Sequence, residues 1–355
     1  MSPDQFRQAL TALYDRWCGE GILITHLTIE YVGGEILLVP TDELEEVVLY
    51  ARQFFANRGI QVHDGVQTNL LGSERRLAHL EKLFGDRIGT SVDDYTGQRT
   101  LKGDATRYQT FFRQSEAHFN RSLPAVFTLD AMTAPHALHL LKRAEEEGRP
   151  LTYRPAFAGG KDITHLPPAV LDAVLIALFD HWACTSPISV EPLTSLLSRR
   201  LGDYGVMIDD DPDGFCPHQS NCTRRSMSLE PNGDLYVCQE MGDAGLGRLG
   251  NALTGHWDPD TWDELDARPR RLLVDCYQCD YYKSCQGGCM LQSHQHGHGF
   301  HGRTDYCSVW KSLFARMDDT IKSRGAEAVA AWLSGIAQRK RSLLPHQGLI
   351  GEVMS

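Results

Sequence analysis

Cysteine is the residue type whose number and spacing point to chemistry, because eight of the ten cysteines lie between residues 216 and 307. The run CYQCDYYKSCQGGC within this stretch has the spacing C-x2-C-x5-C-x3-C. So many thiols in one segment indicate disulfides, metal sites or redox chemistry. The eight are Cys216, Cys222, Cys238, Cys276, Cys279, Cys285, Cys289 and Cys307.

The N-terminal sequence favours metal. MSPDQFRQAL has neither the basic region nor the apolar region of a signal peptide, so we expect a reducing cytoplasm, where disulfides are rare. Eight thiolates suffice for two four-thiolate sites. Spacing alone leaves open whether these are two structural zincs or two iron–sulfur clusters, since both take four thiolates.

A hairpin is expected between Cys222 and Cys238, where the spacing is C-x10-G-x4-C. The residues Pro231-Asn232-Gly233-Asp234 form a turn signal between two short strand-like runs, 226–229 and 235–237. The sequence therefore predicts a hairpin with a thiol at each end.

The whole arrangement resembles the seven-cysteine signature of the SPASM domain. That domain follows the catalytic domain in many radical S-adenosylmethionine (SAM) enzymes, the anaerobic sulfatase-maturating enzymes among them. With Cys216 included, the match covers all eight thiols. The resemblance implies two auxiliary 4Fe-4S clusters. The first would be held by Cys216, Cys222, Cys238 and Cys289, and the second by Cys276, Cys279, Cys285 and Cys307.

Upstream, strand-like runs alternate with helical patterns. The runs lie in 22–32, 59–73, 87–99, 123–131 and 151–160, and the helical patterns in 3–19, 42–57, 134–148 and 166–184. Such alternation predicts parallel βαβ units with ligands at the carboxyl ends of the strands. The expected fold class is α/β. The layout resembles the partial (β/α)6 barrel of radical SAM enzymes without its first strand, followed by the cysteine-rich SPASM domain.

Three strand-end motifs resemble the SAM-contacting segments of that family. Gly33-Gly34-Glu35 is similar to its Gly-Gly-Glu motif, where glycines let the backbone approach the cofactor and a carboxylate balances its ammonium. A Gln-Thr-Asn segment and a Ser-x-Asp segment followed by an arginine are also present. The resemblance implies cofactor contacts at Gly33, Gly34, Glu35, Thr68, Asn69, Ser91, Asp93 and Arg99.

We divide the chain into a partial barrel (1–185), a polar connection (186–215), the auxiliary cluster domain (216–310) and C-terminal helices (311–355). The histidines between the last two ligands favour a solvated loop over a second metal site. They are His294, His296, His298 and His301.

Charge and hydropathy exclude two classes of partner. The net charge is −11 with both signs interspersed, so no basic field for nucleic acid is expected. No apolar run approaches the roughly 20 residues of a membrane-spanning helix. We expect a cytoplasmic protein.

The C-x3-C-x2-C motif that holds the SAM-cleaving cluster of radical SAM enzymes is absent from the sequence. Either the chain is a truncated or wrongly started version of a complete enzyme, or it is a degenerate protein that kept a barrel and two auxiliary clusters. We favour truncation, because the SAM-contact segments survive. As given, the chain should not cleave SAM.

The resemblance implies a peptide- or protein-modifying maturase, an oxidoreductase in which a 5′-deoxyadenosyl radical abstracts hydrogen from a peptide side chain. Its partners would be a peptide or protein substrate and a reductant such as flavodoxin or ferredoxin. Gln239 replaces the aspartate of sulfatase-maturating enzymes, which disfavours a sulfatase substrate and favours a ribosomally made peptide. No catalytic residue is assigned. The alternatives are a non-catalytic iron–sulfur scaffold, for electron relay or peptide binding, and a zinc-ribbon binding protein.

Overall fold

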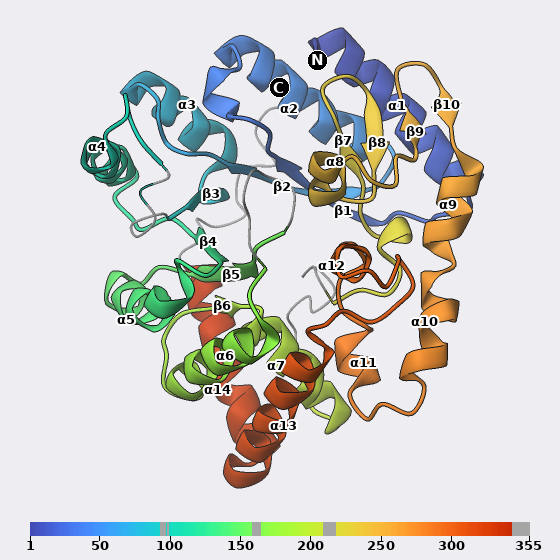
Figure 1. The fold of residues 1–355 in the computed structure, drawn as a ribbon. Coiled ribbons are helices and arrows are strands. Elements are labelled where there is room, and N and C mark those ends of the chain that lie inside the picture. The colour runs from blue at the N-terminus through green and yellow to red at the C-terminus, as the bar shows by residue number, and fades with distance from the viewer. Residues whose placement is uncertain (93–96, 98, 158–164, 209–217, 343–355) are drawn as a thin grey trace.

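Six parallel strands, hydrogen-bonded in sequence order, form the framework of the N-terminal part of the chain (Figure 1). They are β1 (His26–Tyr31), β2 (Gln61–Gln67), β3 (Ile88–Ser91), β4 (Ala125–Leu129), β5 (Leu151–Pro155) and β6 (Val190–Glu191). The computed structural model describes residues 1–92, 97, 99–157, 165–208 and 218–342, and of 337–342 the backbone alone. The predicted α/β class and parallel half-barrel are confirmed.

Helices connect these strands and bury apolar side chains against the sheet. They are α1 (Pro3–Gly19), α2 (Thr41–Ala56), α3 (Glu74–Phe84), α4 (Ala105–Ala117), α5 (Ala137–Glu147), α6 (Pro168–Trp182) and α7 (Leu193–Asp203), with 3-10 turns η1 (Ile36–Leu38) and η2 (Ala134–His136). In α3, Leu77, Leu80 and Phe84 are buried at helical spacing. Because parallel strands share one direction, their carboxyl ends lie at one edge.

Strand β6 and helix α7 lie in the stretch that the sequence predicted as a polar connection, 186–215. Glu191 of β6 pairs with Thr152 of β5, so the strand extends the parallel sheet at its edge. Helix α7 is almost wholly buried, and its serines Ser195 and Ser198 are covered together with its leucines. The part of this stretch that forms β6 and α7, residues 190–203, therefore belongs to the packed core.

The cysteine-rich half is built from short elements (Figure 1). They are η3 (Cys222–Arg224), β7 (Ser228–Leu229), β8 (Asp234–Tyr236), α8 (Gln239–Ala244), β9 (Gly250–Asn251), β10 (His256–Trp257), α9 (Pro259–Asp266), α10 (Arg268–Cys276), α11 (Tyr282–Cys285), α12 (Met290–Gln295), α13 (Cys307–Arg324) and α14 (Ala326–Ser342). The expected hairpin is β7 and β8, and Gly233 takes the positive φ of its turn (89°).

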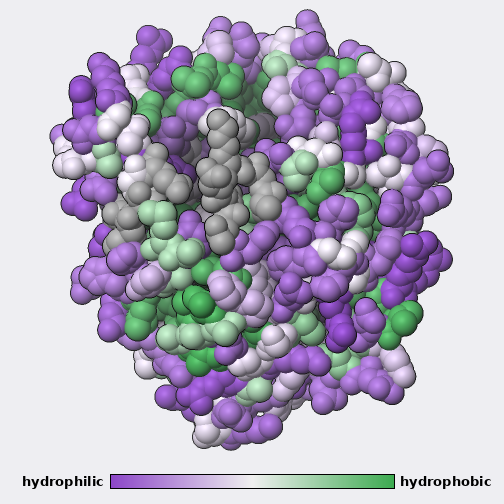
Figure 2. All heavy atoms as spheres, viewed as in Figure 1, coloured by the Kyte–Doolittle hydropathy of each residue, from purple (hydrophilic) through white to green (hydrophobic). Residues whose placement is uncertain are grey.

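Helix α13 joins the two halves, because it starts at Cys307 and packs along α6 and α7. Polar side chains cover most of the face seen in Figure 2, with apolar side chains in separate patches. Among the described residues, no helix is both long enough and apolar enough to cross a bilayer.

Candidate metal centre and cofactor site

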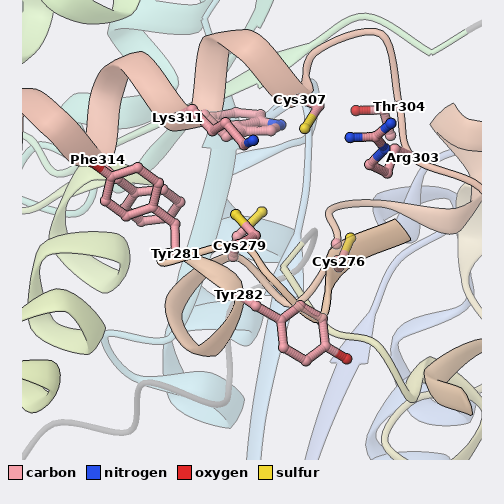
Figure 3. Close-up of a pocket in the computed structure, with 12 residues that line it drawn as sticks. Cys276, Cys279, Tyr281, Tyr282, Arg303, Thr304, Cys307, Lys311 and Phe314 are labelled. Atoms are coloured by element: carbon pink, nitrogen blue, oxygen red, sulfur yellow. The ribbon is translucent and has the colours of Figure 1, made fainter. Parts of the chain in front are cut away.

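Four of the predicted ligand thiols line one pocket, where the ends of three helices meet. Cys276 ends α10, Cys285 ends α11 and Cys307 begins α13, while Cys279 lies in the turn between the first two helices. Figure 3 shows the sulfurs of Cys276, Cys279 and Cys307 directed toward the same space. The four thiols that the sequence assigned to the second cluster are thus neighbours.

A tight turn after α11 shapes this pocket. Gln286, Gly287 and Gly288 all have positive φ angles, of 51°, 81° and 70°. A Cβ atom on Gly287 would lie 2.0 Å from Leu272 Cδ2 of helix α10, so only glycine allows this close approach. The backbone amide of Gly287 lowers the pKa of the Cys285 thiol and so acts against the effect of burial. Amides placed in this way are suited to thiolate and to inorganic sulfur.

The remaining lining of the pocket is aromatic and cationic. Trp310 and Phe314 of α13 lie on one side, and Arg303 and Lys311 bring positive charge. Trp310 is 2% exposed, and its indole Nε1 is a buried donor without a hydrogen-bond partner among the described residues. An orphaned buried donor is costly, and an acceptor held in the pocket would satisfy it. The donor set, charge and orphaned N–H therefore fit an anionic four-thiolate cluster.

Burial favours the protonated form of two of these thiols, Cys276 and Cys285, when no metal is bound. Burial raises the pKa of Cys285 to about 12. Burial also raises the pKa of Cys276, and the neighbouring Cys307 adds to this effect. Because the thiolate is the metal ligand, metal binding must displace these protons.

Three thiols of the other predicted set lie together in a second, apolar cluster. Cys222 begins η3, Cys238 precedes α8 and Cys289 precedes α12. Burial raises the pKa of Cys222 to about 12, with Cys289 contributing, and burial raises the pKa of Cys238 well above its usual range. The fourth predicted ligand, Cys216, lies outside the described residues.

Among the described residues, no group of three or more His, Cys, Asp or Glu side chains is placed to hold a single metal ion. The thiols of a cluster need not converge in that way, since a 4Fe-4S cluster distributes its four thiolates over four irons.

The predicted SAM-contact residues at the ends of β1 and β2 form one hydrogen-bonded group. Glu35 Oε1 accepts from Thr68 Oγ1 (2.6 Å) and from Leu37 N (3.0 Å), and Glu35 Oε2 accepts from Asn69 N (2.8 Å). A Cβ atom on Gly33 or Gly34 would meet nothing within 4 Å, so the backbone there is open to a ligand. The Glu35 carboxylate ties the two strand ends together.

The other predicted SAM contacts are more scattered. Ser91 Oγ, at the end of β3, accepts from Gln67 Nε2 at 3.1 Å. Arg99 Nη1 donates to the Tyr108 hydroxyl of α4 at 3.4 Å. Asp93 lies outside the described residues. The structure therefore brings Glu35, Thr68 and Asn69 together and gives Arg99 a contact on a helix.

No protein-family model matches the sequence, whereas solved structures match its fold. Native anSMEcpe with bound AdoMet (SAM) aligns with a TM-score of 0.65 at 18% identity, covering 89% of both chains. The same enzyme with bound AdoMet and Cp18Cys peptide also gives 0.65, covering 91% of this chain and 92% of that one. SuiB from Streptococcus suis gives 0.52 at 14% identity, covering 87% and 71%. Both are radical SAM/SPASM maturases.

The chain shares the fold of these two proteins. The resemblance seen in the sequence is confirmed at the level of the fold, since the half-barrel and the cysteine-rich half both fall within the aligned 89%.

One contact between the barrel and the cysteine-rich half was not predicted from the sequence. Arg154, near the carboxyl end of β5, donates to Glu240 Oε1 at 2.9 Å. Glu240 lies two residues after Cys238, and the exposed Gln239 stands between them. No sequence signal relates residues 154 and 240; the fold alone brings them together.

The histidine-rich segment of the cysteine-rich half is partly packed and partly exposed. His298 pairs with Asp305 at 2.8 Å, and the amide of Asp305 donates to His296 Nδ1 at 3.0 Å. The His296 ring also packs edge-on against Tyr306. The predicted solvated loop is present at residues 297–299, which are exposed, whereas the rings of His294 and His296 are half-buried against Phe300 and Tyr306.

Proposed function

We propose that this chain is a peptide- or protein-modifying protein of the radical SAM/SPASM kind, whose two thiol sets hold auxiliary 4Fe-4S clusters. The observation that carries this proposal is the pocket in which Cys276, Cys279, Cys285 and Cys307 meet beside an orphaned indole N–H. The shared fold with anSMEcpe, whose structures contain AdoMet and peptide, supports the substrate class.

The strand-end group is the proposed SAM site. Gly33 and Gly34 leave the backbone open, and Glu35 is held in place by Thr68 and Asn69 so that a carboxylate faces an incoming ammonium. Ser91, Asp93 and Arg99 are the further proposed contacts. SAM bound together with a further cluster, for which this sequence has no C-x3-C-x2-C motif, would supply hydrogen abstraction from a substrate side chain. The residues of this chain bind SAM and orient it.

The 355 residues contain no C-x3-C-x2-C, so we propose that this chain by itself does not cleave SAM. Incubation of the reconstituted chain with SAM and dithionite should give no 5′-deoxyadenosine by chromatography, and formation of that product would contradict the proposal. The same missing motif favours the second candidate function, an iron–sulfur scaffold that binds a peptide or relays electrons.

The proposed substrate is a ribosomally made peptide, and the proposed reductant is a flavodoxin or ferredoxin in the cytoplasm. Gln239 cannot accept a proton as the aspartate of sulfatase-maturating enzymes is thought to do, and Glu240 is engaged by Arg154. A peptide lacking a sulfatase motif should therefore bind. Calorimetric titration of candidate peptides into the reconstituted chain measures this directly.

The deciding experiment is the content of iron and sulfide per chain after anaerobic reconstitution. We expect about eight irons and eight sulfides with broad visible absorption, as two four-thiolate clusters require. Cys285→Ala should lose about half of the iron, because one four-thiolate site loses a ligand. Cys18→Ala, at an exposed position outside both thiol sets, is the matched control and should keep all of it. A colourless zinc protein would contradict the proposal.

A further inference from the structure

Arg268, the first residue of α10, is a fully buried cation. Its guanidinium donates to the carbonyls of Gly287 (3.1 Å) and Gly288 (3.2 Å), and on the other side to those of Phe300 and Gly302 (3.2 Å). No carboxylate of the described residues pairs with it, and its Nε atom has no partner. A buried charge without a counter-ion is strongly destabilising.

The carbonyls that hold Arg268 belong to the link between the two thiol sets. Gly287 and Gly288 connect Cys285, of the second set, directly to Cys289, of the first. Phe300 and Gly302 lie on the segment that leads from Cys289 to Cys307. The guanidinium is therefore anchored where the chain crosses from one proposed cluster to the other.

Thiols of both sets act electrostatically on this guanidinium. Burial lowers the pKa of Arg268, and Cys289, Cys222 and Cys276 oppose that effect in decreasing order. Cys289 and Cys222 belong to the first set and Cys276 to the second. When these thiols are deprotonated by metal binding, they supply the negative charge that Arg268 otherwise lacks.

We propose that Arg268 is a shared counter-ion of the two clusters, a positioning residue that raises the reduction potential of both. This inference rests on the proposed function. A four-thiolate cluster is a net anion, and reduction adds one further negative charge. A buried cation stabilises the more negative, reduced form more strongly, because the surrounding dielectric is low. Hydrogen bonding and net charge are established means of setting such potentials.

The test is an EPR-monitored redox titration of the anaerobically reconstituted full chain. In Arg268→Gln we expect both midpoint potentials to move to more negative values than in the wild type. Arg248→Gln is the matched control, because Arg248 is a partly exposed arginine of the same half that pairs with Asp234. That control should leave both potentials unchanged. A potential that stays at its wild-type value in Arg268→Gln, for either cluster, would overturn the inference.

A second variant keeps the inference testable if the glutamine chain does not fold. Arg268→Lys keeps the charge in the buried site but removes the guanidinium nitrogens. In ¹⁵N-arginine-labelled wild type, pulsed EPR of each reduced cluster should show a ¹⁵N coupling that the lysine variant lacks. Identical spectra of the two proteins at either cluster would overturn the inference. A wild-type chain that binds zinc would instead contradict the proposed function.

Discussion

Two single residues, the buried thiols of Cys222 and Cys285, have strongly raised pKa values. Burial raises the pKa of both Cys222 and Cys285 to about 12, which is well above the value of about 8.5 for a thiol in an unfolded chain. The folded, metal-free chain therefore favours neutral thiols. Metal binding has to overcome this preference, so the affinity for metal should rise with pH.

The metal-free chain should lose stability as the pH rises above about 8.5. Between that value and about 12, the folded state keeps protons on Cys222 and Cys285 that the unfolded state releases. The stability is therefore complete below the unfolded pKa and falls by up to about 1.4 kcal/mol per pH unit for each thiol. Urea denaturation of the metal-free chain between pH 7 and 10 measures this slope.

Replacement of one thiol measures how much that thiol contributes to the pH dependence of the free energy of unfolding. Cys285→Ser removes a titrating group from the buried site, so the loss of stability with pH should become shallower. Cys18→Ser, at an exposed position, should leave the slope as it is. A free energy of unfolding that does not change with pH in the wild type would contradict the assignment of both thiols as buried and protonated.

Among the elements, helix α9 fixes the turn that carries Cys222. Asp266, at the end of α9, accepts from Thr223 Oγ1 at 2.9 Å and from both Nε and Nη2 of Arg224 at 2.8 Å. Thr223 and Arg224 form η3 together with Cys222. One carboxylate thus binds two of the three residues of this turn, in addition to the backbone hydrogen bonds of the turn itself.

Asp266→Asn should destabilise the chain by about 1–2 kcal/mol, because a bidentate, charge-assisted interaction is lost in a partly exposed place. Asp263→Asn, on the exposed side of the same helix, is the control and should change stability little. Thermal denaturation of both variants, with iron content after reconstitution, checks this. Equal stability of the two variants would show that Asp266 does not hold the turn.

The sequence predicted the elements with strong local patterns. Each of the strands β1 to β5 lies within the range in which a strand was expected. Helix α7 was missed, because serine and threonine made LTSLLSRRLGD look polar. Its buried Leu193, Leu196, Leu197 and Leu201 follow the helical period, so a signal was present.

Other features depend on tertiary structure and had no local signal. The run ARPRRLL around Arg268 has the composition of a solvated helix face, yet Arg268 is buried by carbonyls from segments 19 and more residues away. In the sequence, Cys289 is much closer to Cys285 than Cys307 is. In the structure, it is Cys307 that shares the pocket with Cys285. The grouping of thiols came from resemblance to a family and not from the spacing itself.

For the whole molecule, α7 and α13 connect the barrel to the thiol pocket through one polar network. Arg200 of α7 pairs with Asp318 of α13 through Nε (2.6 Å) and Nη2 (2.9 Å). Arg200 also pairs with Asp203, which accepts from Ser284, the residue before Cys285. The side chains of Arg200 and Asp318 are only 11% and 10% exposed, so the pair is largely shielded from water.

Asp318→Asn should therefore lower the free energy of unfolding by about 2 kcal/mol, because Arg200 loses a charge-assisted bidentate partner and keeps Asp203. The effect should reach the cluster: the network ends at Ser284, so iron should be released at a lower urea concentration than in the wild type. Asp319→Asn, the exposed neighbour on the same helix, is the control. Parallel urea titrations followed by circular dichroism and by visible absorption report unfolding and iron loss separately. If Asp318→Asn lowers stability while the iron is released as in the wild type, the two halves are joined mechanically by α13 but the thiol pocket does not depend on that junction.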